Sequence, residues 1–307
     1  MNMNAIAPAV PVLATILKND NIPRNVIVDA CWALSYLSDG DDDRIQAIMN
    51  TGVTATLINL LSCAEAKIIT PCVRTLGNFV SGNDKQTQAV LDAGIMECID
   101  KLLTHNKRTI RKESHWLLSN IAAGTVIQID QLAKHQKILE IVVDSAKNGE
   151  WEVRKEAIWV LSNMCGGNDK HINNLVQING IEALSSVLQV SDPRIVIVAM
   201  DAIDKILSVG EKLGYSAYPT YVDECGGLDE LEELQSHENE EVYEKALHIL
   251  DTYFGSEEQD DENLLPQTDG NQFVFGHAPA GKSLDENADM NNAAAAPLQQ
   301  FNFQFGN

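Results

Sequence analysis

Two stretches of the sequence carry the same polar and aromatic residues at the same spacing. ESHWLLSNIAAG spans residues 113–124, and EAIWVLSNMCGG spans residues 156–167. In each stretch a tryptophan follows a glutamate by three residues, and an asparagine follows the tryptophan by four: Glu113, Trp116 and Asn120, then Glu156, Trp159 and Asn163. Residues three or four apart share one face of a helix, so each set would form one stripe.

Together the three residue types suit an extended basic peptide. An asparagine amide can donate to a peptide C=O and accept from a peptide N–H. Neighbouring indoles can hold the aliphatic stem of a lysine or arginine, with a cation–π contribution of about 0.5–2 kcal/mol, while the glutamate binds the charged head. A lone tryptophan on a helix is more often part of the core, and a lone asparagine is more often a cap. Their repetition at one phase favours a binding groove.

Both stretches belong to an internal repeat whose successive units are 42 to 44 residues apart. The tryptophan position recurs at Trp32, Arg74, Trp116, Trp159 and Asp201, and the asparagine position at Tyr36, Asn78, Asn120, Asn163 and Lys205. A second series runs through Gly52, Gly94, Gln136 and Gly180. Because the two series have nearly the same spacing between successive members, they indicate a repeat architecture.

Each repeat has the pattern of three helices, and no stretch has a convincing strand pattern. VTATLINLLS (53–62) and IMECIDKLLT (95–104) place apolar residues at helical spacing. The glycine before each segment suits a sharp turn between helices, because glycine adopts positive φ readily. Helices repeating every roughly 40–47 residues are typical of armadillo repeats. The sequence therefore predicts an all-α armadillo solenoid.

The pattern divides the chain into a repeat domain, residues 1–254, and a tail, residues 255–307. About six units make up the domain, the first of them partial: 5–38, 42–81, 84–123, 126–165, 168–209 and 211–254. The last two units diverge, and the last is acidic, which suits a terminal cap. The tail is acidic and then rich in Asn, Ala and Gln, so we expect it to be disordered. Its phenylalanines form either docking motifs or a non-specific sticky surface.

Composition excludes several classes of function. The formal net charge of −22 disfavours nucleic acid, whose phosphates require a basic surface, and favours basic partners. No apolar run approaches the ~20 residues that cross a bilayer, so no membrane partner is expected. The six cysteines form no CxxC pair, and the histidines lie in no HExxH or triad-like context. The sequence predicts a protein that is not an enzyme and that carries no cofactor or metal.

Four segments resemble repeats of the importin α (karyopherin α) family: ACWALSYLSDG, VRTLGNFVSGND, ESHWLLSNIAAG and EAIWVLSNMCGG, in that order. The resemblance covers about residues 5–254 and corresponds to the middle and C-terminal part of the family. It implies a right-handed armadillo superhelix that binds nuclear localisation signals in an inner groove. The part of the groove present would be the family's minor signal site.

By motif match, the resemblance also implies a role for each groove residue. The implied backbone clamps are Asn78, Asn120 and Asn163, the walls are Trp116 and Trp159, and the acids that pair with basic side chains are Glu113 and Glu156. Arg74 departs from the ladder in a way that the family also shows, and Val80 and Thr87 resemble further lining positions. Lesser candidates are Trp32, Tyr36, Ser119 and Ser162.

The implied partners are cargo proteins with basic signals and an export receptor on the acidic last unit, for a protein that shuttles between cytoplasm and nucleus. The basic segment by which family members bind importin β is missing from this sequence, as are the first repeats. Importin β is therefore expected only if such a segment precedes the chain. We expect a fragment, a truncated product, or a variant that binds signals without transport. The rival interpretation is an armadillo scaffold in signalling or adhesion, which would favour acidic partners, against the charge found here.

Overall fold

The computed structural model describes residues 8–255, 267–269 and 272–274. Contacts divide the chain into two units, Met1–Gly255 and Ser256–Asn307. Most of the segment expected to be a disordered tail lies outside the described residues. Within it, β1 (Gln267–Asp269) pairs antiparallel with β2 (Gln272–Val274). This short ribbon was not anticipated from the sequence pattern.

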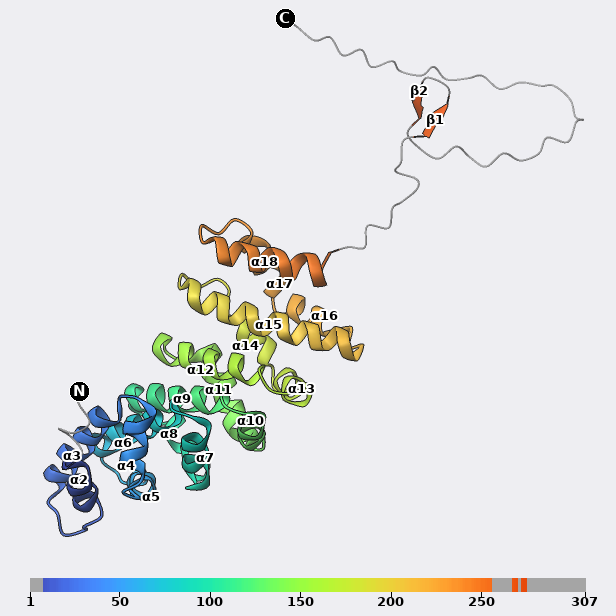
Figure 1. Ribbon diagram of the computed structural model, residues 1–307. Helices are drawn as coiled ribbons and strands as arrows, with labels where there is room; N and C mark the ends of the chain where they lie inside the picture. The colour runs from blue at the N-terminus through green and yellow to red at the C-terminus, as the bar shows by residue number, and fades with distance from the viewer. Residues whose placement is uncertain (1–7, 256–266, 270–271, 275–307) are drawn as a thin grey trace, which may run out of the picture. The chain divides into compact units, whose positions relative to one another are not determined.

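The first unit consists of helices that recur in the same order, so the prediction of an all-α armadillo fold is confirmed (Figure 1). The first helices of the repeats are α4 (Asp42–Met49), α7 (Asp84–Asp92), α10 (Val126–Ala133), α13 (Asp169–Gln177) and α16 (Ala217–Glu224). The second helices are α2 (Ala9–Leu17), α5 (Thr54–Leu60), α8 (Ile99–Leu103, after the 3-10 turn η1, Ile95–Glu97), α11 (Gln136–Asn148), α14 (Gly180–Ser185) and α17 (Gly227–Leu234). The third helices are α3 (Arg24–Ser38), α6 (Ala66–Val80), α9 (Arg108–Ala122), α12 (Trp151–Met164), α15 (Pro193–Leu213) and α18 (Glu240–Tyr253).

Side-chain caps start the first helices and also join neighbouring repeats. Capping boxes open α7, α10 and α13 at Asn83, Thr125 and Asn168, where the side chains satisfy amides that the helix leaves free. The N3 residue of each box also bonds to the first helix of the preceding repeat. In α13 it is His171, whose Nε2 lies 2.6 Å from Asp130 Oδ1 of α10. Gln86 Nε2 donates to Asp42 O over 2.8 Å, and Gln128 Nε2 donates to Asp84 O over 2.7 Å. One side chain thus closes its own helix and binds the first helix of the preceding repeat.

Most turns between first and second helices contain a residue in the left-handed backbone conformation; the turn between α10 and α11 does not, and His135 there has φ of −99°. Gly52 and Gly94 have φ of 71° and 90°, as the glycine series suggests. In the fifth repeat the left-handed residue is Asn179, with φ of 64°, and not the glycine that follows it. Asparagine tolerates this region better than most residues. Gly180 instead begins α14, buried close to Leu175 O.

The third helices pack against one another in chain order and provide the centre of the core (Figure 1). A fully buried apolar residue lies two positions after the tryptophan position in five of them: Leu34, Leu76, Leu118, Leu161 and Ile203. Two residues along a helix is a rotation of about 200°. The tryptophan and asparagine positions therefore lie on the side of each third helix opposite to this buried residue.

Candidate functional site

The candidate site is the stripe formed by the tryptophan and asparagine positions of α3, α6, α9 and α12. Contacts join α3 to α6, α6 to α9, and α9 to α12. Packed helices lie about 8–10 Å apart, and an extended peptide rises about 3.3 Å per residue. Each helix therefore offers one set of contacts for about three residues of a ligand running across the stack. We call this surface the inner ladder.

The asparagines of the ladder also hold the helices together. Asn78 Nδ2 on α6 donates to Ser35 O and Ser38 Oγ of α3, over 3.0 and 2.9 Å. Asn163 Nδ2 on α12 donates to Ser119 O of α9 over 2.9 Å. Asn120 Nδ2 on α9 is buried and has no hydrogen-bond partner among the described residues. The three asparagines are therefore not equivalent: two have a donor already in use, and the middle one does not.

The absence of a side chain at Gly77 lets Trp116 pack against the preceding helix. The Trp116 ring lies over the backbone of α6, at a point where a Cβ on Gly77 would overlap it. Trp116 is half-buried, while Trp159 is 40% exposed. In α3 the ring of Trp32 stacks on that of Tyr36, with centroids 5.9 Å apart. The ladder therefore presents partly open aromatic faces along its length.

The two glutamates one turn before the tryptophans form an acidic end to the ladder. Glu113 is buried, and Lys112 Nζ is 3.9 Å from its carboxylate. The pKa of Glu156 is raised, chiefly because burial disfavours the charged form. The Lys112 ammonium opposes this rise in pKa and the Glu113 carboxylate adds to it. The charges of the two glutamates on α9 and α12 therefore interact, and Lys112 partly offsets them.

The remaining sequence-predicted residues do not all reach the surface. Val80 and Thr87 are only 2% and 3% exposed, and Thr87 Oγ1 donates to Val80 O over 3.1 Å. These two close the turn between α6 and α7 and are not accessible to a ligand. Ser119 is buried and donates to Trp116 O, and Ser162 is half-buried beside Asn163. Arg74 is exposed and makes no ion pair within residues 8–255.

At α15 the ladder positions carry charges that are used within the structure. Asp201, at the tryptophan position, forms an ion pair with Lys245 of α18, with Nζ and Oδ1 2.5 Å apart. Lys205, at the asparagine position, is exposed. The pattern of the ladder therefore ends after Asn163.

The sequence analysis named Ser119 and Ser162 as lesser candidates but missed what the residue just before each asparagine position does in the packing. Ser35, Gly77, Ser119 and Ser162 are all small, and Gly77 shows why: the indole of the next repeat occupies the space above it. The recurrence of a small residue at this position was visible in the sequence. The reason for a small residue there depends on which helix packs against this position, and the sequence pattern does not reveal that helix.

The described part of the chain contains no helix long and apolar enough to cross a bilayer, and no grouping of three or more metal-ligating side chains. Comparison with protein families gives two matches. A family model described as Armadillo/beta-catenin-like repeat matches residues 41–81 and 83–123, and one described as Atypical Arm repeat matches residues 216–267.

Curated relatives match across most of the chain. Importin subunit alpha-1b of Oryza sativa subsp. japonica is 40% identical over 286 residues, which is 90% of this chain and 52% of that protein. Importin subunit alpha-4 of Arabidopsis thaliana is 41% identical over 290 residues, or 90% of this chain and 53% of that protein. The chain thus spans about half the length of the curated relatives it matches.

Solved structures agree on the fold. A designed armadillo repeat protein in complex with the peptide (KR)4 superposes with a TM-score of 0.72 and 29% identity, covering 80% of this chain and 99% of that one. A computationally designed armadillo repeat protein for modular peptide recognition superposes with a TM-score of 0.72 and 28% identity, covering 79% of this chain and 98% of that one. By its repeats and its fold the chain is an armadillo-repeat protein, and it is similar to importin α proteins over about half of their length.

Proposed function

We propose that the inner ladder binds an extended peptide rich in lysine and arginine, of the kind that serves as a nuclear localisation signal. The observation that carries this proposal is the pair of partly open indoles, Trp116 and Trp159, each one turn after a glutamate, Glu113 or Glu156, on the neighbouring helices α9 and α12. A ligand ammonium or guanidinium placed there would favour the ionised form of Glu156. Its aliphatic stem would cover the indoles. The net charge of −22 attracts such a peptide at long range.

The ligand backbone would bind the asparagines, and Asn120 is the best placed of them. An unpartnered buried amide N–H costs about 1–3 kcal/mol, so the Asn120 side chain gains by turning toward a peptide carbonyl. Asn78 and Asn163 use Nδ2 for the neighbouring helix and would offer Oδ1 to a peptide N–H. The solved structure of a designed armadillo protein with (KR)4 supports a basic ligand for this fold.

On this basis the chain would act as an adaptor for nuclear import that moves between cytoplasm and nucleus. Its relatives are named as importin subunits. Importin β would bind only through a basic segment outside this sequence. The acidic last repeat, α16 to α18, would bind an export receptor. Its exposed carboxylates include Glu232, Glu233 and Glu244, which suit a basic partner surface.

A titration with a fluorescent (KR)4 peptide tests the ladder. We expect Trp116→Ala and Trp159→Ala each to weaken binding about tenfold or more, which corresponds to about 1.4 kcal/mol, since each removes an indole wall. Binding should also weaken with salt, because exposed charges are screened. The matched control is Trp151→Ala, since Trp151 lies at the start of α12, where Arg154 and Lys155 already cover its ring.

Circular dichroism and thermal unfolding would establish that the variants fold. Equal affinity for parent and folded Trp116→Ala or Trp159→Ala proteins would reject the ladder as the binding surface. An acidic peptide of the same length provides the second comparison. Preference for the acidic peptide would favour the scaffold interpretation.

A further inference from the structure

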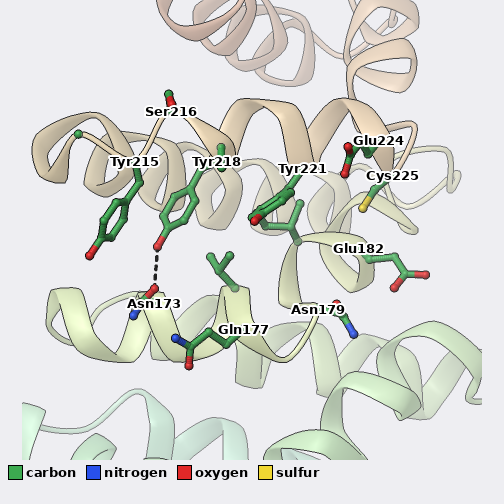
Figure 2. A pocket seen from close by; sticks show the side chains of 14 residues that line it. Asn173, Gln177, Asn179, Glu182, Tyr215, Ser216, Tyr218, Tyr221, Glu224 and Cys225 are labelled. Atoms are coloured by element: carbon green, nitrogen blue, oxygen red, sulfur yellow. Dashed lines mark hydrogen bonds between the residues drawn. The ribbon is translucent and has the colours of Figure 1, made fainter.

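A second cavity lies between the first helices of the last two repeats, away from the inner ladder. It has a volume of about 790 Å³ and is lined by residues of α13, α14 and residues 214–225, which include α16 and are called the α16 segment below. Figure 2 shows Tyr215, Tyr218 and Tyr221 projecting from the α16 segment toward α13, with Glu182 and Glu224 near one end. We call this cavity the tyrosine cleft.

The fold holds one of the three tyrosines rigidly. Tyr218 is buried, and its hydroxyl donates to Asn173 Oδ1 over 3.0 Å. Its ring packs so closely over Gly210 that a Cβ there would lie 2.6 Å from Cδ2. Gly214, with φ of 71°, ends α15 and turns the chain back toward α16. The ring of Tyr215 then lies 5.5 Å from that of Tyr218, inclined at 52°.

The other two tyrosines present open aromatic surface. Tyr215 is 45% exposed and Tyr221 is 43% exposed. Neither hydroxyl has a hydrogen-bond partner among the residues that the structure describes. Tyrosines at 215, 218 and 221 recur every three residues and share one side of the segment. Two open rings around a fixed one are therefore available to a ligand.

The charge in the cleft is negative. Glu182 pairs with Lys147, with Nζ and Oε1 2.5 Å apart. Glu224 is exposed and makes no ion pair within residues 8–255. Aromatic faces attract cations, and an unpaired carboxylate at the end of the same cavity supplies the matching charge. A guanidinium suits both features, because it stacks on rings and bonds a carboxylate through two N–H groups.

We propose that the tyrosine cleft binds an arginine side chain carried on a linear segment of a partner protein. The guanidinium stacks on the open ring of Tyr221, and Glu224 at the same end of the cleft accepts its N–H groups. The aliphatic stem and the flanking peptide run along the cleft toward Tyr215. This cleft lies on first helices, whereas the inner ladder lies on third helices. The two sites can therefore be occupied independently, and this inference does not depend on the proposed function of the ladder.

The test uses the full chain with Trp116→Ala and Trp159→Ala, so that the ladder does not compete for the probe. The probes are acetyl-Gly-Ser-Arg-Ser-Gly-amide and the same peptide with citrulline, which replaces the guanidinium by a neutral urea of similar shape. With tyrosine rings labelled with ¹³C, titration with the arginine peptide should shift the Tyr215 and Tyr221 signals. The Tyr243 ring, 40% exposed on α18, serves as the reference that should not move.

We expect the citrulline peptide to bind about fivefold more weakly or worse, from loss of the cation–π and charge contributions. Glu224→Gln should weaken arginine binding by a similar factor, whereas Glu232→Gln, the same charge change on α17, should not. Tyr221→Ala should reduce binding as well. Equal binding of the two peptides, equal effects of Glu224→Gln and Glu232→Gln, or an arginine titration that leaves Tyr215 and Tyr221 unmoved would each overturn the proposal.

Discussion

Gly77 and Trp116 illustrate how one missing methyl group shapes the ladder. The indole of Trp116 occupies the space that a side chain at position 77 would fill, so the ring lies against the α6 backbone. Ser119 on α9 is the repeat equivalent of Gly77 and does carry a Cβ. Trp159, the tryptophan of the next repeat, is the more exposed of the two indoles. The two indoles of the inner ladder are therefore exposed to different degrees.

Gly77→Ala is expected to destabilise the protein, although alanine favours helix by about 1 kcal/mol over glycine. The added methyl group must displace the Trp116 ring, and overpacking of this kind costs about 1–3 kcal/mol. Urea unfolding followed by circular dichroism measures the change in free energy, and tryptophan emission reports the displaced ring. Ser119→Ala, at the same position of α9, should cost about 1 kcal/mol at most. A Gly77→Ala protein more stable than the parent would contradict the packing.

At the scale of helices, side-chain hydrogen bonds join neighbouring repeats at some of their first helices and some of their third helices. Asn78 and Asn163 bind the backbone of the preceding third helix, and Gln86 and Gln128 bind the preceding first helix. Such bonds supplement the apolar contacts that each repeat makes only with its neighbours. Residues that face a ligand can therefore also be part of the scaffold.

Asn78→Ala and Asn120→Ala should separate these two roles. Asn78→Ala removes two hydrogen bonds to α3 and should lower the free energy of unfolding by about 1–3 kcal/mol. Asn120→Ala removes an amide nitrogen without a partner and should cost less than about 1 kcal/mol. Peptide affinity should nevertheless fall in the Asn120→Ala protein. Denaturant unfolding and peptide titration measure the two effects, and an Asn120→Ala protein as destabilised as Asn78→Ala would speak against this division.

Across the whole molecule, a continuous core joins the repeats from α2 to α18, and a buried imidazole lies within it. His115 on α9 is fully buried, with Nδ1 2.8 Å from Arg111 O and Nε2 without a partner among the described residues. Burial lowers the pKa of His115 to about 4, while the bond to the Arg111 carbonyl opposes that shift. The folded protein therefore keeps this group neutral well below its ordinary pKa of 6.5.

Stability should therefore depend on pH through His115. The unfolded chain takes up the proton near pH 6.5 and the folded chain only near pH 4, so stability is lost as the pH falls between these values. The full difference amounts to about 3 kcal/mol. Urea unfolding between pH 7 and 4 should show a shallower loss of stability in His115→Leu than in the parent. Identical slopes would show that His115 does not contribute.

Much of this protein can be predicted from local patterns in its sequence. The repeat period, the helices and the face shared by Glu113, Trp116 and Asn120 follow from residue spacing, because helical geometry fixes which residues share a side. The change of residue type at Asp201 is visible in the same way, and the structure adds that Asp201 pairs with Lys245.

Contacts between helices depend on which side chains of one repeat meet those of the next, and only the tertiary structure decides these. In the tertiary structure Val80 and Thr87 are buried, and Trp116 packs on Gly77. The side-chain amides of Asn78 and Asn163 donate to the neighbouring helix, whereas that of Asn120 has no partner among the described residues. The tertiary structure also brings the tyrosines of the α16 segment over α13, about 45 residues earlier. Spacing along the chain determines the face of a helix, whereas accessibility and partners depend on the neighbouring helix in space.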